Sequence, residues 1–117
     1  MKDKKALYEL QAKICSAMAH PIRLQILDLL SDGEKNSTEI LKVLKVPKAT
    51  LSQHVSVLRD ANLIKVRKDG TCGYLSLAIP KIKDACAIVQ TVLVEKIKVE
   101  EKRNLSLIKE LKSKVGR

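Results

Sequence analysis

The hydrophobic pattern of this chain changes its period near residue 62 and changes back near residue 80. Before this point, apolar residues recur three and four positions apart, which is the spacing of a helix face. Residues 64–68 then alternate apolar and basic side chains, Asp69-Gly70 is a strong hairpin signal, and residues 73–78 can form the returning strand. From Pro80 the helical spacing resumes. The sequence therefore predicts a mainly α fold with a small β-hairpin.

The helix boundaries follow from residues that break or cap a helix. Pro21 suits a first helical turn, where its missing N–H costs nothing. Asn36 stands three residues before Glu39, as in a capping box. The length of 117 residues fits a single domain, 1–117. Within it we predict helices over residues 3–18, 21–30, 36–44, 48–61 and 80–112.

The charge of the chain indicates what kind of partner it binds. The net charge is +10, an excess that favours polyanions, either nucleic acid or an acidic membrane surface. Proteins that bind single strands or RNA loops usually stack bases on aromatic rings. This chain has no Trp, no Phe and only two Tyr. Composition therefore favours double-stranded DNA as the nucleic-acid partner.

Apolar runs and cysteines indicate the compartment. No apolar run approaches the roughly 18 residues that a membrane span needs, and the charged N-terminus does not resemble a signal peptide. We therefore expect a cytoplasmic protein without a membrane partner. In that compartment its three cysteines are expected to be reduced thiols.

The predicted fourth helix has two unlike faces. Leu51, Val55 and Leu58 share the face that can anchor the helix to a core. The rest of the helix carries short hydroxyl and amide side chains that can hydrogen-bond base edges, with no acidic residue between Val46 and Arg59. The alternative is an ordinary polar surface helix. The candidate base-contacting residues are Thr50, Ser52, Gln53 and Ser56, and Lys48 at the helix start can reach a phosphate.

Two further features could contact DNA. His54 leans toward the core edge, so it is either a packed structural histidine or a base contact. The hairpin, residues 64–78, carries Lys65, Arg67 and Lys68, which are either phosphate clamps or solubilising edge charges. The predicted order is short helices, a tight turn, a polar-faced helix and a basic hairpin, which is the order of a winged helix-turn-helix. Residues 36–61 would form the helix-turn-helix, and residues 64–78 would form the wing.

Three stretches of the sequence resemble the ArsR/SmtB family of winged-helix repressors. They are residues 19–27 (AHPIRLQIL), residues 50–59 (TLSQHVSVLR), and residues 69–74 together with Leu77. The resemblance covers about residues 7–95. It implies a homodimer joined through the first and last helices, 1–18 and 80–112. It also implies binding to an inverted-repeat operator and release by an inducer.

The sequence departs from the metal-sensing members of that family. Asn36 and Thr38 stand where Cys-x-Cys binds soft metals, and neither residue can supply a thiolate. Asp84 and Glu95 are present on the last helix, but no histidine follows His54. Because zinc prefers imidazole and thiolate ligands, we predict no metal site of the usual kinds and no cofactor.

The cysteines are the remaining sensor candidates. Cys15 lies on the first helix and Cys86 on the last, and the resemblance implies that these helices pack together. Three readings stay open: both thiols are simply packed, they form a redox or reactive-sulfur switch, or they bind arsenite or another soft ion. The last reading would need Cys72, in the wing, as a third ligand.

Other classes of protein are less compatible with the sequence. An enzyme would need a nucleophile–base pair, a metal site or a phosphate cradle. The chain has no Gly-rich loop and no Cys-x-x-Cys, and its two histidines are 34 residues apart, so we predict that it is not an enzyme. The hypothesis is therefore a sequence-specific repressor with an unidentified inducer. A winged-helix protein-interaction module remains the alternative.

Overall fold

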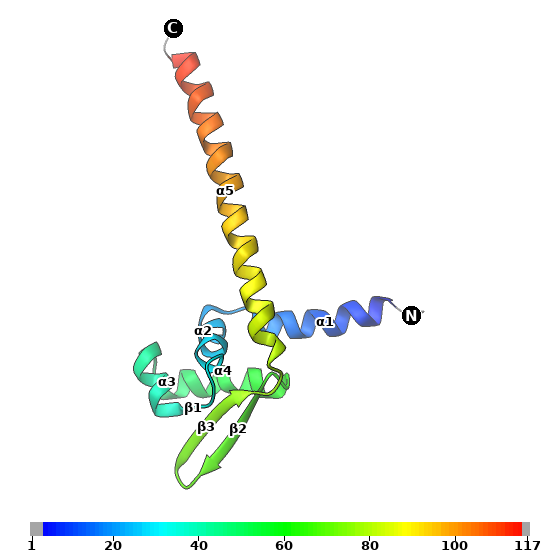
Figure 1. The fold of residues 1–117 in the computed structure, drawn as a ribbon, viewed down its shortest axis with the longest axis vertical. Coiled ribbons are helices and arrows are strands. Elements are labelled where there is room, and N and C mark those ends of the chain that lie inside the picture. The colour runs from blue at the N-terminus through cyan, green and yellow to red at the C-terminus, as the bar shows by residue number, and fades with distance from the viewer. Residues whose placement is uncertain (1–3, 116–117) are drawn as a thin grey trace. The chain divides into compact units, whose positions relative to one another are not determined.

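The computed structural model describes residues 4–115, and Figure 1 shows the order of the elements. The predicted order of four helices, a hairpin and a last helix is confirmed. Contacts divide the chain into two units, one up to Asp84 and one from Ala85 onward. The elements are α1 (Lys4–Met18), α2 (Pro21–Leu30), β1 (Lys35–Asn36), α3 (Ser37–Leu44), α4 (Lys48–Asp60), β2 (Ile64–Asp69), β3 (Cys72–Leu77) and α5 (Lys81–Val115).

The core of the first unit joins helices α1 to α4, the first residues of α5 and the sheet. Helix α2 contributes three buried residues at helical spacing, and α4 contributes Leu51 and Leu58, two turns apart. Burial of each such side chain contributes about 1.5–3 kcal/mol, so these contacts fix the orientation of α4. The buried apolar residues are Ala17, Ile26, Leu27, Leu30, Ile40, Leu51, Leu58, Leu63, Ile64, Leu75 and Ile82.

Side-chain caps fix where α2 and α3 begin. The Nδ1 atom of His20 accepts a hydrogen bond from the Ile22 N–H at 3.1 Å, and Pro21 occupies the first helical position. The Oδ1 atom of Asn36 accepts one from the Glu39 N–H at 2.8 Å, which is the expected cap of α3. Helix α3 ends at Lys45, whose φ of 53° is left-handed, and this turns the chain into α4.

The sheet has three antiparallel strands in the order β1-β3-β2. The hairpin runs from the Ile64–Leu77 pair to the Asp69–Cys72 pair, and Gly70 in its loop has a φ of 63°. That φ favours glycine, which confirms the predicted turn. Strand β1 was not predicted, because two residues are too short to show alternation. It exists because the free edge of β3 offers Tyr74 and Leu75 as pairing partners.

Helix α5 runs three residues beyond the predicted end at 112. No Gly or Pro interrupts the sequence between Pro80 and Val115, so nothing ends the helix at the last apolar side chain of the stripe, Leu111. Among the described residues, no helix combines the length and apolar character required to cross a membrane.

Candidate nucleic-acid interface

Helix α4 presents the polar face that the sequence predicted. Because Leu51 and Leu58 are buried, the opposite side of the helix faces outward, and Ser52 and Gln53 are exposed there. Of the four candidate base contacts, Gln53 has the longest side chain, and its amide can both donate and accept hydrogen bonds. Thr50 and Ser56 are half-buried on the flanks, and Lys48 is exposed in the first turn.

His54 lies against a second histidine. Its ring centroid is 4.3 Å from that of His20, and the two ring planes are tilted by 42°. Burial lowers the pKa of His54, and the nearby His20 and Arg23 lower it further, so the imidazole is neutral at pH 7. The Nε atom of Arg23 is itself buried without an acceptor among the described residues. This environment favours the packed histidine over the base contact.

The wing carries an ion pair that the sequence did not predict. The Nη2 atom of Arg67 donates to Oε1 of Glu34 at 2.8 Å, and its Nε donates to Oε2 at 3.4 Å. The hydrogen bond from Arg67 lowers the pKa of Glu34, and the same contact raises the pKa of Arg67. No local pattern pointed to Glu34, because 33 residues separate the partners.

The other basic residues of the predicted interface are available to an anion. Lys65 and Lys68 on β2, like Lys48 on α4, are exposed. Within residues 4–115, none of the three forms an ion pair. The described part of the chain therefore presents three lysines without an ion-pair partner, one on α4 and two on the hairpin.

The sensor candidates lie in different units. Cys15 is exposed on α1 in the first unit, and Cys86 is half-buried on α5 in the second. Cys72 is exposed at the start of β3. Across the described part of the chain, no three His, Cys, Asp or Glu side chains gather as a metal site.

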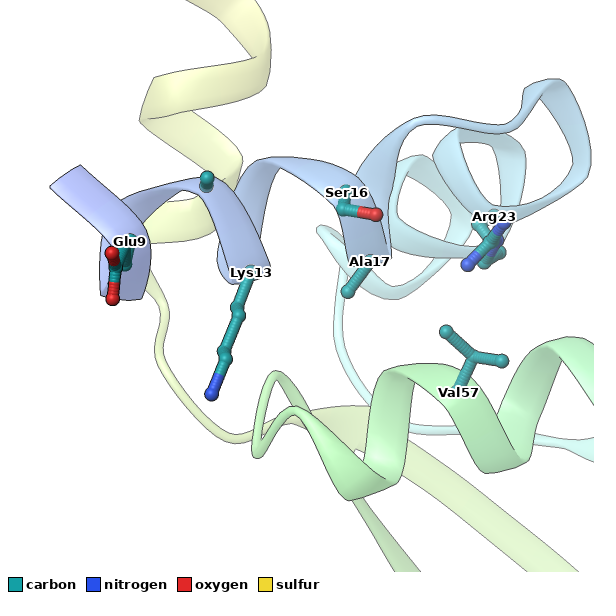
Figure 2. Close-up of a pocket in the computed structure, with 7 residues that line it drawn as sticks. Glu9, Lys13, Ser16, Ala17, Arg23 and Val57 are labelled. Carbon is teal, nitrogen blue, oxygen red and sulfur yellow. The ribbon is translucent and has the colours of Figure 1, made fainter.

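A pocket of about 370 Å³ lies where α1 meets α2 and α4. Figure 2 shows Lys13 and Ala17 pointing from α1 toward α4, and Val57 pointing back from α4. Ala17 of α1 is buried beside this pocket. Leu7, Leu10 and Ile14 of the same helix do not line the pocket, and all three are exposed. Helix α1 therefore keeps three exposed apolar side chains although its last turns pack against the domain.

Comparison with known proteins gives a consistent set of relatives. A family model described as "Bacterial regulatory protein, arsR family" matches residues 20–66, from the cap of α2 into β2. The uncharacterized HTH-type transcriptional regulator Rv0081 of Mycobacterium tuberculosis is 34% identical over 92 residues, which are 78% of this chain and 81% of the relative. Its crystal structure matches with a TM-score of 0.73 at 33% identity, over 80% of this chain and 95% of that one.

Two further relatives carry more specific descriptions. The transcriptional repressor PagR of Bacillus anthracis is 32% identical over 82 residues, covering 69% of this chain and 82% of the repressor. The domain Mb0332 of Mycobacterium bovis, described as a homodimeric winged helix-turn-helix DNA-binding domain and a possible ArsR-family regulator, matches with a TM-score of 0.72 at 32% identity. That match covers 84% of this chain and 91% of the domain.

Proposed function

Since this chain belongs to the arsR family of bacterial regulatory proteins and is a DNA-binding transcriptional regulator, we propose that it is a homodimeric repressor of an inverted-repeat operator. The observation that carries the proposal is the exposed, acid-free face of α4 around Ser52 and Gln53, which buried Leu51 and Leu58 hold in place. An unidentified inducer releases the repressor from the operator.

In the proposed complex, α4 enters the major groove. Gln53 reads a base edge, since a side-chain amide can bond both N6 and N7 of adenine. Ser52 reaches a neighbouring base, and Thr50 and Ser56 contribute at the flanks. The lysines 48, 65 and 68 contact phosphates, which position the protein without reading sequence. His54 supports α4 from the core side.

The proposed dimer covers two apolar surfaces that are exposed in the single chain. The surface on α1 consists of Leu7, Leu10 and Ile14. The surface on α5 includes Val89, which is 64% exposed, and Leu93, which is 50% exposed. Large exposed apolar patches mark interaction surfaces, because water contact with them is unfavourable. The homodimeric description of the Mycobacterium bovis neighbour supports a second copy of this chain as the occupant.

The proposed sensor is the pair Cys15 and Cys86. Oxidation by hydrogen peroxide would join the two thiols as a disulfide, with two protons and two electrons passing to the peroxide, which becomes two waters. Two sulfane sulfur atoms of an inorganic polysulfide could instead react with the two thiols. One is then inserted between the cysteine sulfurs as a polysulfide bridge, which spans a longer gap, and the other takes up the two electrons and two protons and leaves as hydrogen sulfide. Either bridge would change the arrangement of the terminal helices, and thus the spacing of the two α4 helices. The alternative is a repressor that binds arsenite or a soft metal through its thiolates.

The first prediction concerns base readout. The Gln53→Ala variant should lose about 1–3 kcal/mol of operator affinity and relax its base preference, because a bidentate base contact is removed. Fluorescence anisotropy on operator and random duplexes measures both effects. Gln25→Ala is the matched control, because Gln25 is an exposed glutamine on α2. Unchanged discrimination in Gln53→Ala would show that Gln53 does not read a base.

The second prediction concerns the thiols. Hydrogen peroxide or an inorganic polysulfide should lower operator affinity in the protein and in Cys72→Ser, and a reductant should restore it. Cys15→Ser and Cys86→Ser should each lose the response, because one thiol cannot form the bridge. Mass spectrometry after hydrogen peroxide, polysulfide and arsenite exposure identifies the adduct. A response that survives in the double variant of Cys15 and Cys86 would refute the switch, and an arsenite adduct would support the alternative.

A further inference from the structure

The side chain of Arg67 lies across the outer face of the three-stranded sheet. Arg67 on β2 is paired in register with Tyr74 on β3, and Tyr74 is paired on its other side with Asn36 of β1. The Arg67 guanidinium lies 4.5 Å from the centre of the Tyr74 ring, a cation–π contact. Its far end meets the carboxylate of Glu34, which stands two residues before Asn36. Strand order therefore directs the guanidinium toward Glu34.

The guanidinium group has a planar fork that binds carboxylates and phosphates in the same bidentate way. In this structure two of its donors, Nη2 and Nε, are occupied by the two oxygens of Glu34. Arg67 can therefore use that side of its fork for a DNA phosphate only if Glu34 leaves. The lysines 65 and 68 on the same strand meet no such competitor among the described residues.

The pair is well placed to exchange partners. The side chains of Arg67 and Glu34 are 55% and 39% exposed. An exposed pair of this kind contributes little to stability, because water and salt compete with it. A DNA phosphate carries the same charge as the carboxylate and adds the release of its condensed counterions. Exchange of the carboxylate for a phosphate is therefore feasible without unfolding the wing.

We propose that Glu34 is a built-in competitor of DNA phosphate for Arg67 and so lowers the affinity of the wing for every duplex alike. The proposal rests on the proposed function, because it assumes that the wing meets the DNA backbone. A phosphate contact carries no sequence information, so Glu34 weakens operator and random binding by the same factor. The ratio of specific to non-specific affinity is left unchanged.

Salt dependence gives a second signature. When DNA displaces Glu34, the released carboxylate attracts a cation from solution, and this uptake offsets one counterion released from the DNA. Removing the charge of Glu34 abolishes the uptake. The slope of log affinity against log salt should then steepen by up to about one unit for each protomer bound.

The test compares the protein with Glu34→Gln, which keeps the shape of the side chain and removes its charge. The probe is a random duplex of about 30 base pairs, with the operator duplex alongside. Glu34→Gln should bind both duplexes more tightly, by about two- to five-fold per protomer, the range expected when an exposed ion pair no longer competes. Arg67→Ala should weaken binding to both duplexes. In the Arg67→Ala background Glu34→Gln should keep only the small general gain of removing one negative charge.

Asp32→Asn is the matched control for general electrostatics. Asp32 is exposed two residues before Glu34 and forms no ion pair with the described residues, so Asp32→Asn reports the effect of removing one nearby negative charge. An equal gain in Asp32→Asn, a loss of affinity in Glu34→Gln, or a gain of undiminished size in the Arg67→Ala background would each overturn the proposal. Thermal unfolding checks that the variants are folded. If the unaltered protein binds operator and random duplex equally, the proposed function itself fails, independently of Glu34.

Discussion

Operator affinity should fall by about a thousandfold or more when salt rises from about 50 to about 200 mM, because the contact is largely electrostatic. The exposed lysines 48, 65 and 68 give a dimer six candidate phosphate contacts. Six neutralised phosphates predict a slope of log affinity against log salt near −5. Titration of labelled operator duplex at several salt concentrations measures this slope.

Operator geometry supplies the control for that experiment. Two α4 helices related by a two-fold axis must enter successive major grooves, so half-sites should lie about one helical turn apart. A duplex with the half-sites moved apart by half a turn should bind no better than random DNA. Equal binding to operator and random duplex at every salt concentration would instead support the winged-helix interaction module.

The largest effect of a single substitution is expected for Leu93→Glu. Leu93 belongs to the exposed apolar surface of α5 that we assign to the dimer, and a buried charge there is strongly unfavourable. The variant should sediment as a monomer. Its operator affinity should fall by at least about a hundredfold, because the two half-sites are then bound by two separate monomers and no longer by one dimer.

Thr91→Glu is the matched control for Leu93→Glu. It adds the same charge to the same helix, but Thr91 lies one turn from Glu95, on the side of α5 that already carries an acid. This variant should remain dimeric and bind the operator. If Leu93→Glu also remains a dimer in sedimentation, the interface lies elsewhere than this surface of α5.

The sequence by itself determined the helices, the hairpin and the two faces of α4. The order of helices and hairpin, the Asn36 cap and the Gly70 turn all follow from spacing and caps that act over a few residues. The same local periodicity separated buried Leu51 and Leu58 from exposed Gln53. Such features can be predicted from sequence because they depend on residues that are close along the chain. Neighbouring residues decide both the hydrogen bonds within a helix or turn and the face on which each side chain lies.

Only the tertiary structure decided which distant side chains meet. Strand β1 forms because the edge of β3 offers unpaired backbone groups, and nothing in Lys35 and Asn36 themselves indicates a strand. The sequence left two interpretations of His54 open, and the contact with His20, 34 residues earlier in the chain, favours the packed histidine. In the sequence Arg67 does not differ from the other basic residues of the wing. In the structure its guanidinium lies over the Tyr74 ring and binds the Glu34 carboxylate, because the order of the strands places these residues side by side. These pairings depend on how the helices and strands pack, and no short-range pattern in the sequence encodes that packing.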